Sequence, residues 1–78
     1  MSIRILVDYN TVDERDRVEI HHEGQEELVS QLVHKMPIIV YDWDNLEFDA
    51  IAEYHEGVQG WYAIPDWATR RDLPSLSD

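Results

Sequence analysis

The first third of the chain alternates between apolar and polar positions with a period of two. Ile3, Ile5 and Val7 fall on one side of this alternation, and mostly polar residues separate them. A period of two is typical of a β-strand with one buried face. Residues 17–22 repeat the pattern after a polar connection, so we expect a second strand there, antiparallel to the first.

The pattern changes to helical spacing after Gly24. Five apolar residues then fall on one helical face: Leu28, Val29, Leu32, Val33 and Met36. Glu26 lies near the start of this segment and Lys35 near its end, as the helix macrodipole favours. The pattern predicts a helix over residues 25–35. Pro37 sets its end, because the residue before a proline disfavours helical geometry.

Three more strands are indicated in the second half of the chain. Residues 38–41 are a short, continuous apolar run, as in a central strand. Residues 46–55 alternate again. The side expected to face the core carries Leu46, Phe48, Ala50, Ala52 and Tyr54, and the side expected to face solvent carries Glu47, Asp49, Glu53 and His55. Only Ile51 interrupts the row of polar residues on the solvent-facing side. Residues 61–64 form the return strand, which Pro65 ends because proline cannot donate a hydrogen bond.

Two short polar segments complete the pattern. Residues 42–45 predict a turn in which side chains bond to the backbone. Residues 66–73 predict a single helical turn capped by Asp66. Residues 6–9 and 60–67 resemble the strand ends of SH3-like barrels, although the adjacent tryptophan pair of signalling SH3 domains is missing. This resemblance implies a strand arrangement and nothing about activity.

The expected fold is α+β or mainly β, with elements in the order β-β-α-β-β-β. Five short strands and tight turns suit a small, strongly bent antiparallel sheet or an SH3-like, partly open barrel with the helix at one end. A flat sheet with the helix on one face is the alternative. A length of 78 residues predicts one small domain over residues 1–73, followed by a frayed tail at residues 74–78.

The composition excludes several kinds of site. The chain has no cysteine, which excludes disulfides, thiolate zinc sites and cysteine nucleophiles. No apolar run approaches the ~18 residues that span a bilayer. The N-terminus also lacks the pattern of a signal peptide. We therefore expect a cytoplasmic protein that does not bind membranes.

No group of residues indicates catalysis, a cofactor or a metal site. Nucleophile and phosphate-binding motifs are missing, and a domain of this size rarely encloses a cleft that shifts a catalytic pKa. His21 and His22 are neighbours, which point to opposite faces of a strand. Residues 42–47 lack the glycine and the ligand spacing of a calcium loop. Six scattered basic residues also argue against direct nucleic-acid binding.

Charge is the strongest functional signal. Seventeen acidic and six basic residues give a formal net charge of −11. Residues 37–68 contain seven carboxylates, three tryptophans and three tyrosines, with no lysine or arginine. Solubility, adaptation to high salt, and attraction of a cationic partner all explain such a surface.

The sharpest hypothesis is an acidic surface with exposed aromatic side chains. Trp43, between two aspartates in a polar turn, is the best candidate for an exposed aromatic that contacts Arg or Lys through cation–π interactions. Phe48, Tyr54 and either Trp61 or Trp67 are expected in the core instead. The candidate partner-binding residues are Tyr41, Asp42, Trp43, Asp44, Tyr62 and Asp66.

These features predict a small acidic, non-enzymatic interaction module that binds a basic protein or peptide. The alternatives are an inhibitor or antitoxin-like protein that imitates nucleic acid, and a structural protein whose acidic surface is adapted to high salt. A homodimer is a further prediction, with the apolar helix stripe as its interface: Leu28, Val29, Leu32, Val33 and Met36.

Overall fold

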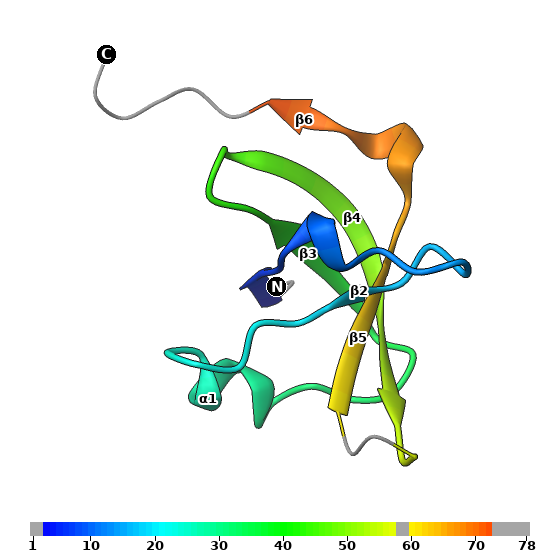
Figure 1. Cartoon of the computed structure of the whole chain (residues 1–78). Coiled ribbons are helices and arrows are strands. Elements are labelled where there is room, and N and C mark those ends of the chain that lie inside the picture. Colours follow the sequence, from blue (N-terminus) through cyan, green and yellow to red (C-terminus); the bar gives the residue numbers. More distant parts are fainter. Residues whose placement is uncertain (1–2, 58–59, 73–78) are drawn as a thin grey trace.

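The computed structural model describes residues 3–57 and 60–72 (Figure 1). In this part of the chain six strands form one sheet: β1 (Ile3–Leu6), β2 (Val18–Glu19), β3 (Pro37–Tyr41), β4 (Leu46–His55), β5 (Gly60–Pro65) and β6 (Arg71–Asp72). One α-helix, α1 (Glu26–Val29), and two 3-10 turns, η1 (Tyr9–Thr11) and η2 (Trp67–Thr69), complete the described elements.

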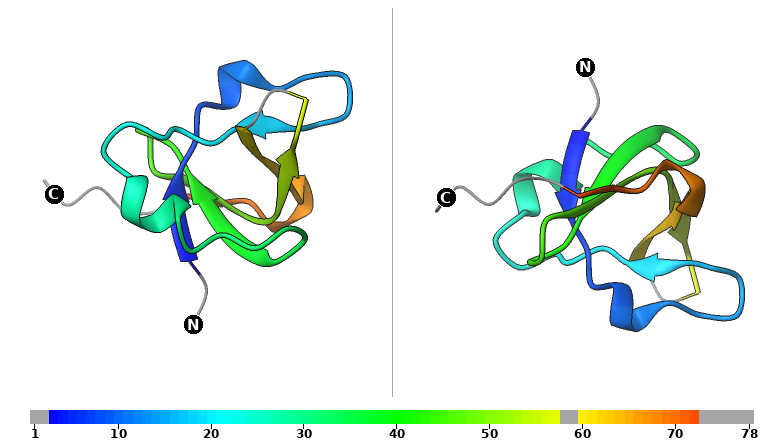
Figure 2. Two further views of the ribbon diagram at one scale, coloured as in Figure 1. Left: turned by 90° about the horizontal axis from the view of Figure 1, so that it is seen from below. Right: turned by 90° about the horizontal axis from the view of Figure 1, so that it is seen from above.

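The sheet curls strongly into a half-barrel, which confirms the predicted fold class. Its main strand order is β1-β3-β4-β5-β2, and β6 pairs separately with the start of β4. A single antiparallel bridge between Val7 and Ile20 brings the two ends of this order together. Figure 2 shows the strands wrapped around a common core, with α1 near one end. The element order also follows the predicted β-β-α-β-β-β, with β6 added at the end.

The sheet is mixed, so the prediction of a purely antiparallel sheet was wrong. β1 pairs with β3 in parallel, with Ile5 opposite Val40. β2 pairs with β5, and its segment meets the first strand only at the Val7–Ile20 bridge, where the two run antiparallel as expected. A parallel pair needs a crossover connection, and residues 7–36 supply one by passing through β2 and α1.

β4 is the strand that organises the sheet. Its ten residues pair with β3, β5 and β6. Phe48, Ala50 and Ala52 face the core as predicted. Tyr54, expected on the same side, is 37% exposed. It lies beyond the end of the core, where its ring packs edge-on against Trp61 at 5.1 Å between centroids.

The core consists of aliphatic side chains from every main strand. Its buried members are Ile5, Val7, Val18, Ile20, Leu32, Ile38, Val40, Phe48, Ala50, Ala52 and Ala63. Trp61 packs against this cluster, as expected for one of the two candidate core tryptophans. Trp67 is 40% exposed and contacts Phe48 and Tyr9 edge-on at the rim.

The helix is much shorter than the predicted residues 25–35. After Val29 the backbone tightens, because the amides of Gln31 and Leu32 bond to carbonyls three residues back. Lys35 then adopts a left-handed φ of 72°, and its amide donates to the carbonyl of Ala52 at 2.7 Å. Hydrogen bonding to β4 thus replaces the last turns of the predicted helix.

The apolar stripe of the predicted helix is mostly covered by this chain's own core. Leu32 is buried, and Leu28, Val29 and Met36 pack against the core cluster. Val33 is the exception and is 62% exposed. The homodimer stays a prediction, and a single exposed valine gives it little apolar surface.

The turn at residues 42–45 forms as predicted, whereas the helical turn predicted over residues 66–73 covers only Trp67–Thr69 and is followed by the strand β6. Asp42 Oδ1 accepts hydrogen bonds from the amides of Asp44 and Leu46, and Asn45 supplies a left-handed φ of 62°. Asp66 caps η2 by accepting from the amide of Ala68 at 3.1 Å. The predicted tail at residues 74–78 lies outside the described residues.

Candidate functional site: a groove along β2

A groove of about 420 Å³ runs along β2 and the residues that follow it. Its lining comes from three parts of the chain: the turn η1, the β2 segment and the start of β5. We call it the β2 groove and define it by Asp8, Thr11, Glu19, Ile20, His21, His22, Glu23, Gly60, Trp61 and Tyr62.

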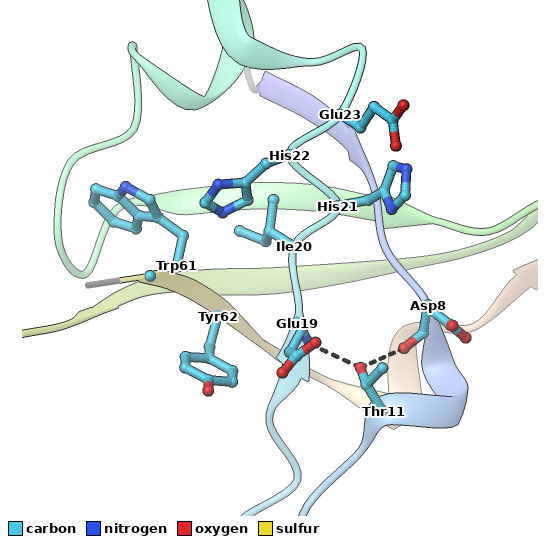
Figure 3. A pocket seen from close by; sticks show the side chains of 10 residues that line it. Asp8, Thr11, Glu19, Ile20, His21, His22, Glu23, Trp61 and Tyr62 are labelled. Atoms are coloured by element: carbon cyan, nitrogen blue, oxygen red, sulfur yellow. Dashed lines mark hydrogen bonds between the residues drawn. The ribbon is translucent and has the colours of Figure 1, made fainter. Parts of the chain in front are cut away.

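The period of two along the β2 segment places the polar residues at the groove. Val18 and Ile20 are buried on the core side, so Glu19 between them points outward and is exposed. In Figure 3 this segment runs through the middle of the view. Trp61, Tyr62 and His22 lie on one side of it, and His21, Glu23 and Asp8 lie on the other.

A threonine hydroxyl fixes the turn η1 beside β2. Thr11 Oγ1 accepts a hydrogen bond from the Glu19 amide at 2.9 Å and donates to the Asp8 carbonyl at 2.6 Å (Figure 3). The Asp8 carboxylate accepts from the Asn10 amide and caps η1. These hydrogen bonds within η1 therefore fix the positions of Asp8 and Thr11 at the groove.

The groove carries negative charge that the described residues do not neutralise. Asp8, Glu19 and Glu23 form no ion pair with any residue in 3–57 or 60–72. Glu19 and Glu23 are exposed, and Asp8 is half-buried. Carboxylates and two aromatic rings line the same groove, an arrangement that suits a Lys or Arg side chain, whose stem packs on the rings while its charged end meets the acids.

Two of the six predicted partner-binding residues lie at this groove. Tyr62 lines it. Trp43 borders it, because its ring packs edge-on against His21 at 5.8 Å between centroids. Trp43 is 62% exposed, in agreement with the expectation that it is the exposed aromatic of the turn.

The other predicted residues do not join this site as one cluster. Tyr41 is covered on one face by the Arg4 guanidinium, 4.2 Å from the ring centroid. Asp42 is occupied by its turn hydrogen bonds, whereas Asp44 is exposed in the same turn as Trp43. Asp66 lies at the end of β5, where its amide bonds to the carbonyl of Asp49.

The chain's own arginine already occupies part of the Tyr62 surface. The Arg17 guanidinium lies over the Tyr62 ring, 5.1 Å from its centroid, and pairs with Asp13 at 2.7 Å. Hydrogen bonds from Arg17 and Arg15 lower the pKa of Asp13 to about 2. His55 packs edge-on against the same tyrosine ring.

The expectation that the acidic side chains of β4 face solvent was partly wrong. Glu47 is only 8% exposed, because Arg4 and Arg71 clamp it with hydrogen bonds of 2.8 Å each. Burial raises the pKa of the Glu47 carboxyl, but the two arginines outweigh it and leave the pKa below its ordinary value of 4.5. Asp49 bonds to Arg71 and Glu53 to Lys35, so the acids of β4 are largely neutralised within the chain.

Sequence reasoning missed Asp8, Glu19 and Glu23 as site residues. The alternation in residues 17–22 does place Glu19 on the outer face, so one signal was present. The presence of Asp8 and Glu23 in one groove with Trp61 depends on the pairing of β2 with β5, which the local pattern does not contain.

The described part of the chain has neither a group of three metal ligands nor a helix that could span a membrane. In residues 3–57 and 60–72, no three His, Asp or Glu side chains are grouped so that they could hold a metal ion. None of the described helices has both the length and the apolar character that a bilayer crossing requires. Comparison of the chain with protein-family models, curated proteins and solved structures found no match to any of them.

Proposed function

We propose that this chain is a small, non-enzymatic, cytoplasmic interaction module, and that its β2 groove binds lysine or arginine side chains of a basic protein or peptide. The observation that carries the proposal is the set of three carboxylates, Asp8, Glu19 and Glu23, which have no ion-pair partners among the described residues and line the same groove as Trp61 and Tyr62.

The contrast between the acids of β4 and those of the groove favours the groove as the binding site. The acids of β4 are paired with Arg4, Arg71 and Lys35, so binding a partner there would first break internal ion pairs. The groove acids need no such exchange. Trp43 at the border extends the aromatic surface toward the β3–β4 turn.

The net charge of −11 supports fast capture of a cationic partner. A strongly negative surface accelerates encounter with a positive one, and this acceleration falls as salt rises. Each exposed ion pair adds only about 0.2–1 kcal/mol, so several contacts are required for useful affinity.

The test is the binding of a synthetic lysine- and arginine-rich peptide to this chain. Tryptophan fluorescence and backbone NMR shifts of the chain measure the binding. The double variant Glu19→Gln and Glu23→Gln is expected to weaken binding about fivefold, from two lost ion pairs. The control is Glu14→Gln with Glu56→Gln, which changes the net charge equally at exposed positions outside the groove. Equal losses in both double variants would mean that only net charge matters and would overturn the groove.

Competition separates this proposal from imitation of nucleic acid. A partner held as an ordinary basic peptide is expected to stay bound when short duplex DNA or RNA is added at equal concentration. If nucleic acid displaces this chain from the partner, the chain occupies the partner's nucleic-acid site. That result would favour the inhibitor or antitoxin-like alternative instead.

A further inference from the structure

One apolar residue on the outer face of the sheet has no role in the core. Ile51 interrupts the otherwise polar side of β4 and is 37% exposed. Its cross-strand partners are Pro37 on β3 and Ile64 on β5. Three apolar side chains therefore form a row across three neighbouring strands, and Ile39 lies on the same face of β3.

This row forms a hollow of about 360 Å³, open to solvent. We call it the Ile51 hollow and define it by Pro37, Ile39, Ile51 and Ile64, with Asp49 and Asp66 at its border. Ile39 and Ile64 are half-buried, and Pro37 is exposed. None of these four residues belongs to the core or packs against it.

The border of the hollow is acidic. Asp49 is paired with Arg71 at 2.9 Å. Asp66 accepts from the Ala68 amide but forms no ion pair with the residues described. The hollow thus offers apolar contact and an unpaired carboxylate side by side.

A second copy of this chain does not fit the hollow. Two chains that each carry a net charge of −11 repel one another. Four apolar side chains also fall far short of the roughly 800 Å² per partner that a stable dimer buries. A cationic segment that carries an aliphatic side chain matches both the apolar floor and the acidic border.

We propose that the Ile51 hollow is a second docking surface, which receives an aliphatic side chain of a cationic peptide segment while Asp66 pairs with a lysine or arginine of the same segment. The β2 groove is lined by other residues, so this inference does not depend on the function proposed for that groove.

The test uses two short synthetic peptides and the isoleucine methyl signals of the whole chain. In the first peptide leucine and lysine alternate, and in the second serine replaces every leucine at equal charge. The leucine peptide is expected to shift the methyl signals of Ile39, Ile51 and Ile64 and to leave that of the buried Ile5, which lines neither the hollow nor the β2 groove, unchanged. The serine peptide is expected to leave all of them unchanged.

Variants then assign the two parts of the contact. Ile51→Thr keeps a β-branched side chain and is expected to weaken the leucine peptide about tenfold through lost apolar burial. Val33→Thr also introduces a hydroxyl in place of apolar surface, at an exposed position outside the hollow, and is expected to have no effect. Asp66→Asn keeps the cap of η2, since both residues cap well, and is expected to weaken binding through lost charge alone.

Three results would overturn the proposal. The first is equal methyl shifts of Ile39, Ile51 and Ile64 with the two peptides, which would leave charge as the only attraction at the hollow. The second is methyl shifts of Ile39, Ile51 and Ile64 on dilution without peptide, which would assign the face to self-association. The third is unchanged methyl signals in the unaltered chain, a result that does not depend on the stability of any variant. Because Glu19→Gln with Glu23→Gln leaves the hollow intact, the methyl shifts should persist in that variant even if the groove proposal fails.

Discussion

At the scale of single residues, the side chain of Gln25 makes hydrogen bonds to the Leu6 backbone of the kind that a neighbouring strand makes. Its side-chain amide accepts from the Leu6 amide at 2.7 Å and donates to the Leu6 carbonyl at 3.0 Å, as a neighbouring backbone would. It also donates to the carbonyl of His21. One side chain thus joins the end of β1 to the segment after β2, at the point where the half-barrel closes.

Changing Gln25 to Glu is expected to destabilise the fold by about 2 kcal/mol at neutral pH, because a carboxylate would replace the donor toward two carbonyls. Gln31→Glu is the matched control, since Gln31 is exposed and its side chain makes only a long contact of 3.4 Å to Glu27. Urea unfolding of both variants measures the difference. Equal losses would show that the added charge, and not the Leu6 contact, is responsible.

Glu47 is the second residue with a structural role. It links β1, β4 and β6, because Arg4 and Arg71 both bond to its carboxylate. Glu47→Gln keeps the shape but loses the charge, and we expect a loss of about 1–2 kcal/mol at pH 7, since both arginines are partly exposed.

The pH dependence of this loss follows from the lowered pKa of Glu47. The folded-state pKa lies below the unfolded value of 4.5, so the stabilisation is complete above pH 4.5 and disappears as the pH falls through the folded value. The gap in unfolding free energy between the original chain and Glu47→Gln should therefore narrow between pH 5 and pH 2.5. Urea unfolding at a series of pH values measures it, and a constant gap would contradict the clamp.

At the scale of elements, the β3–β4 turn shows how one side chain holds a hairpin. Asp42 Oδ1 bonds to two backbone amides, and Asn45 takes the left-handed conformation that Asn tolerates well. Asp42→Ala is expected to cost about 1 kcal/mol, as for the loss of a cap. Asp44→Ala, two positions further along the same turn and exposed, is expected to cost much less, as thermal unfolding of the pair can check. A similar cost at both positions would mean that the turn depends on charge and not on these hydrogen bonds.

The elements also show where local pattern stops being informative. Five strands and the β3–β4 turn followed from the apolar patterns and from Asp, Asn and Pro at their ends, whereas β6 lies in a segment predicted to be helical. The helix α1 did not follow from its pattern, because the amide of Lys35 and the carbonyl of Met36 bond to Ala52 across the chain. Residues 30–36 carry a helical pattern, but hydrogen bonds to β4 outweigh it in the folded state.

At the scale of the whole molecule, charge opposes compactness. The described ion pairs use the carboxylates of Asp13, Glu47, Asp49, Glu53 and Asp72, whereas the net charge remains −11. Raising sodium chloride from about 0.05 to 0.5 M is expected to raise the melting temperature, since screening weakens the repulsion between the remaining acids. Differential scanning calorimetry tests this. A fall in melting temperature would mean that the ion pairs contribute more than the repulsion costs.

The sequence by itself determined which residues avoid water, where the chain turns and how strongly negative the surface is, because these properties depend on near neighbours and on composition. The tertiary structure decided the rest. The parallel pairing of β1 with β3 made the sheet mixed, and the pairing of β4 with β6 placed Arg71 opposite Glu47, whose carboxylate also bonds to Arg4. The pairing of β2 with β5 brought Asp8 and Glu23 into one groove with Trp61. These contacts join residues far apart in the chain, and their free energies depend on which partners the fold brings together.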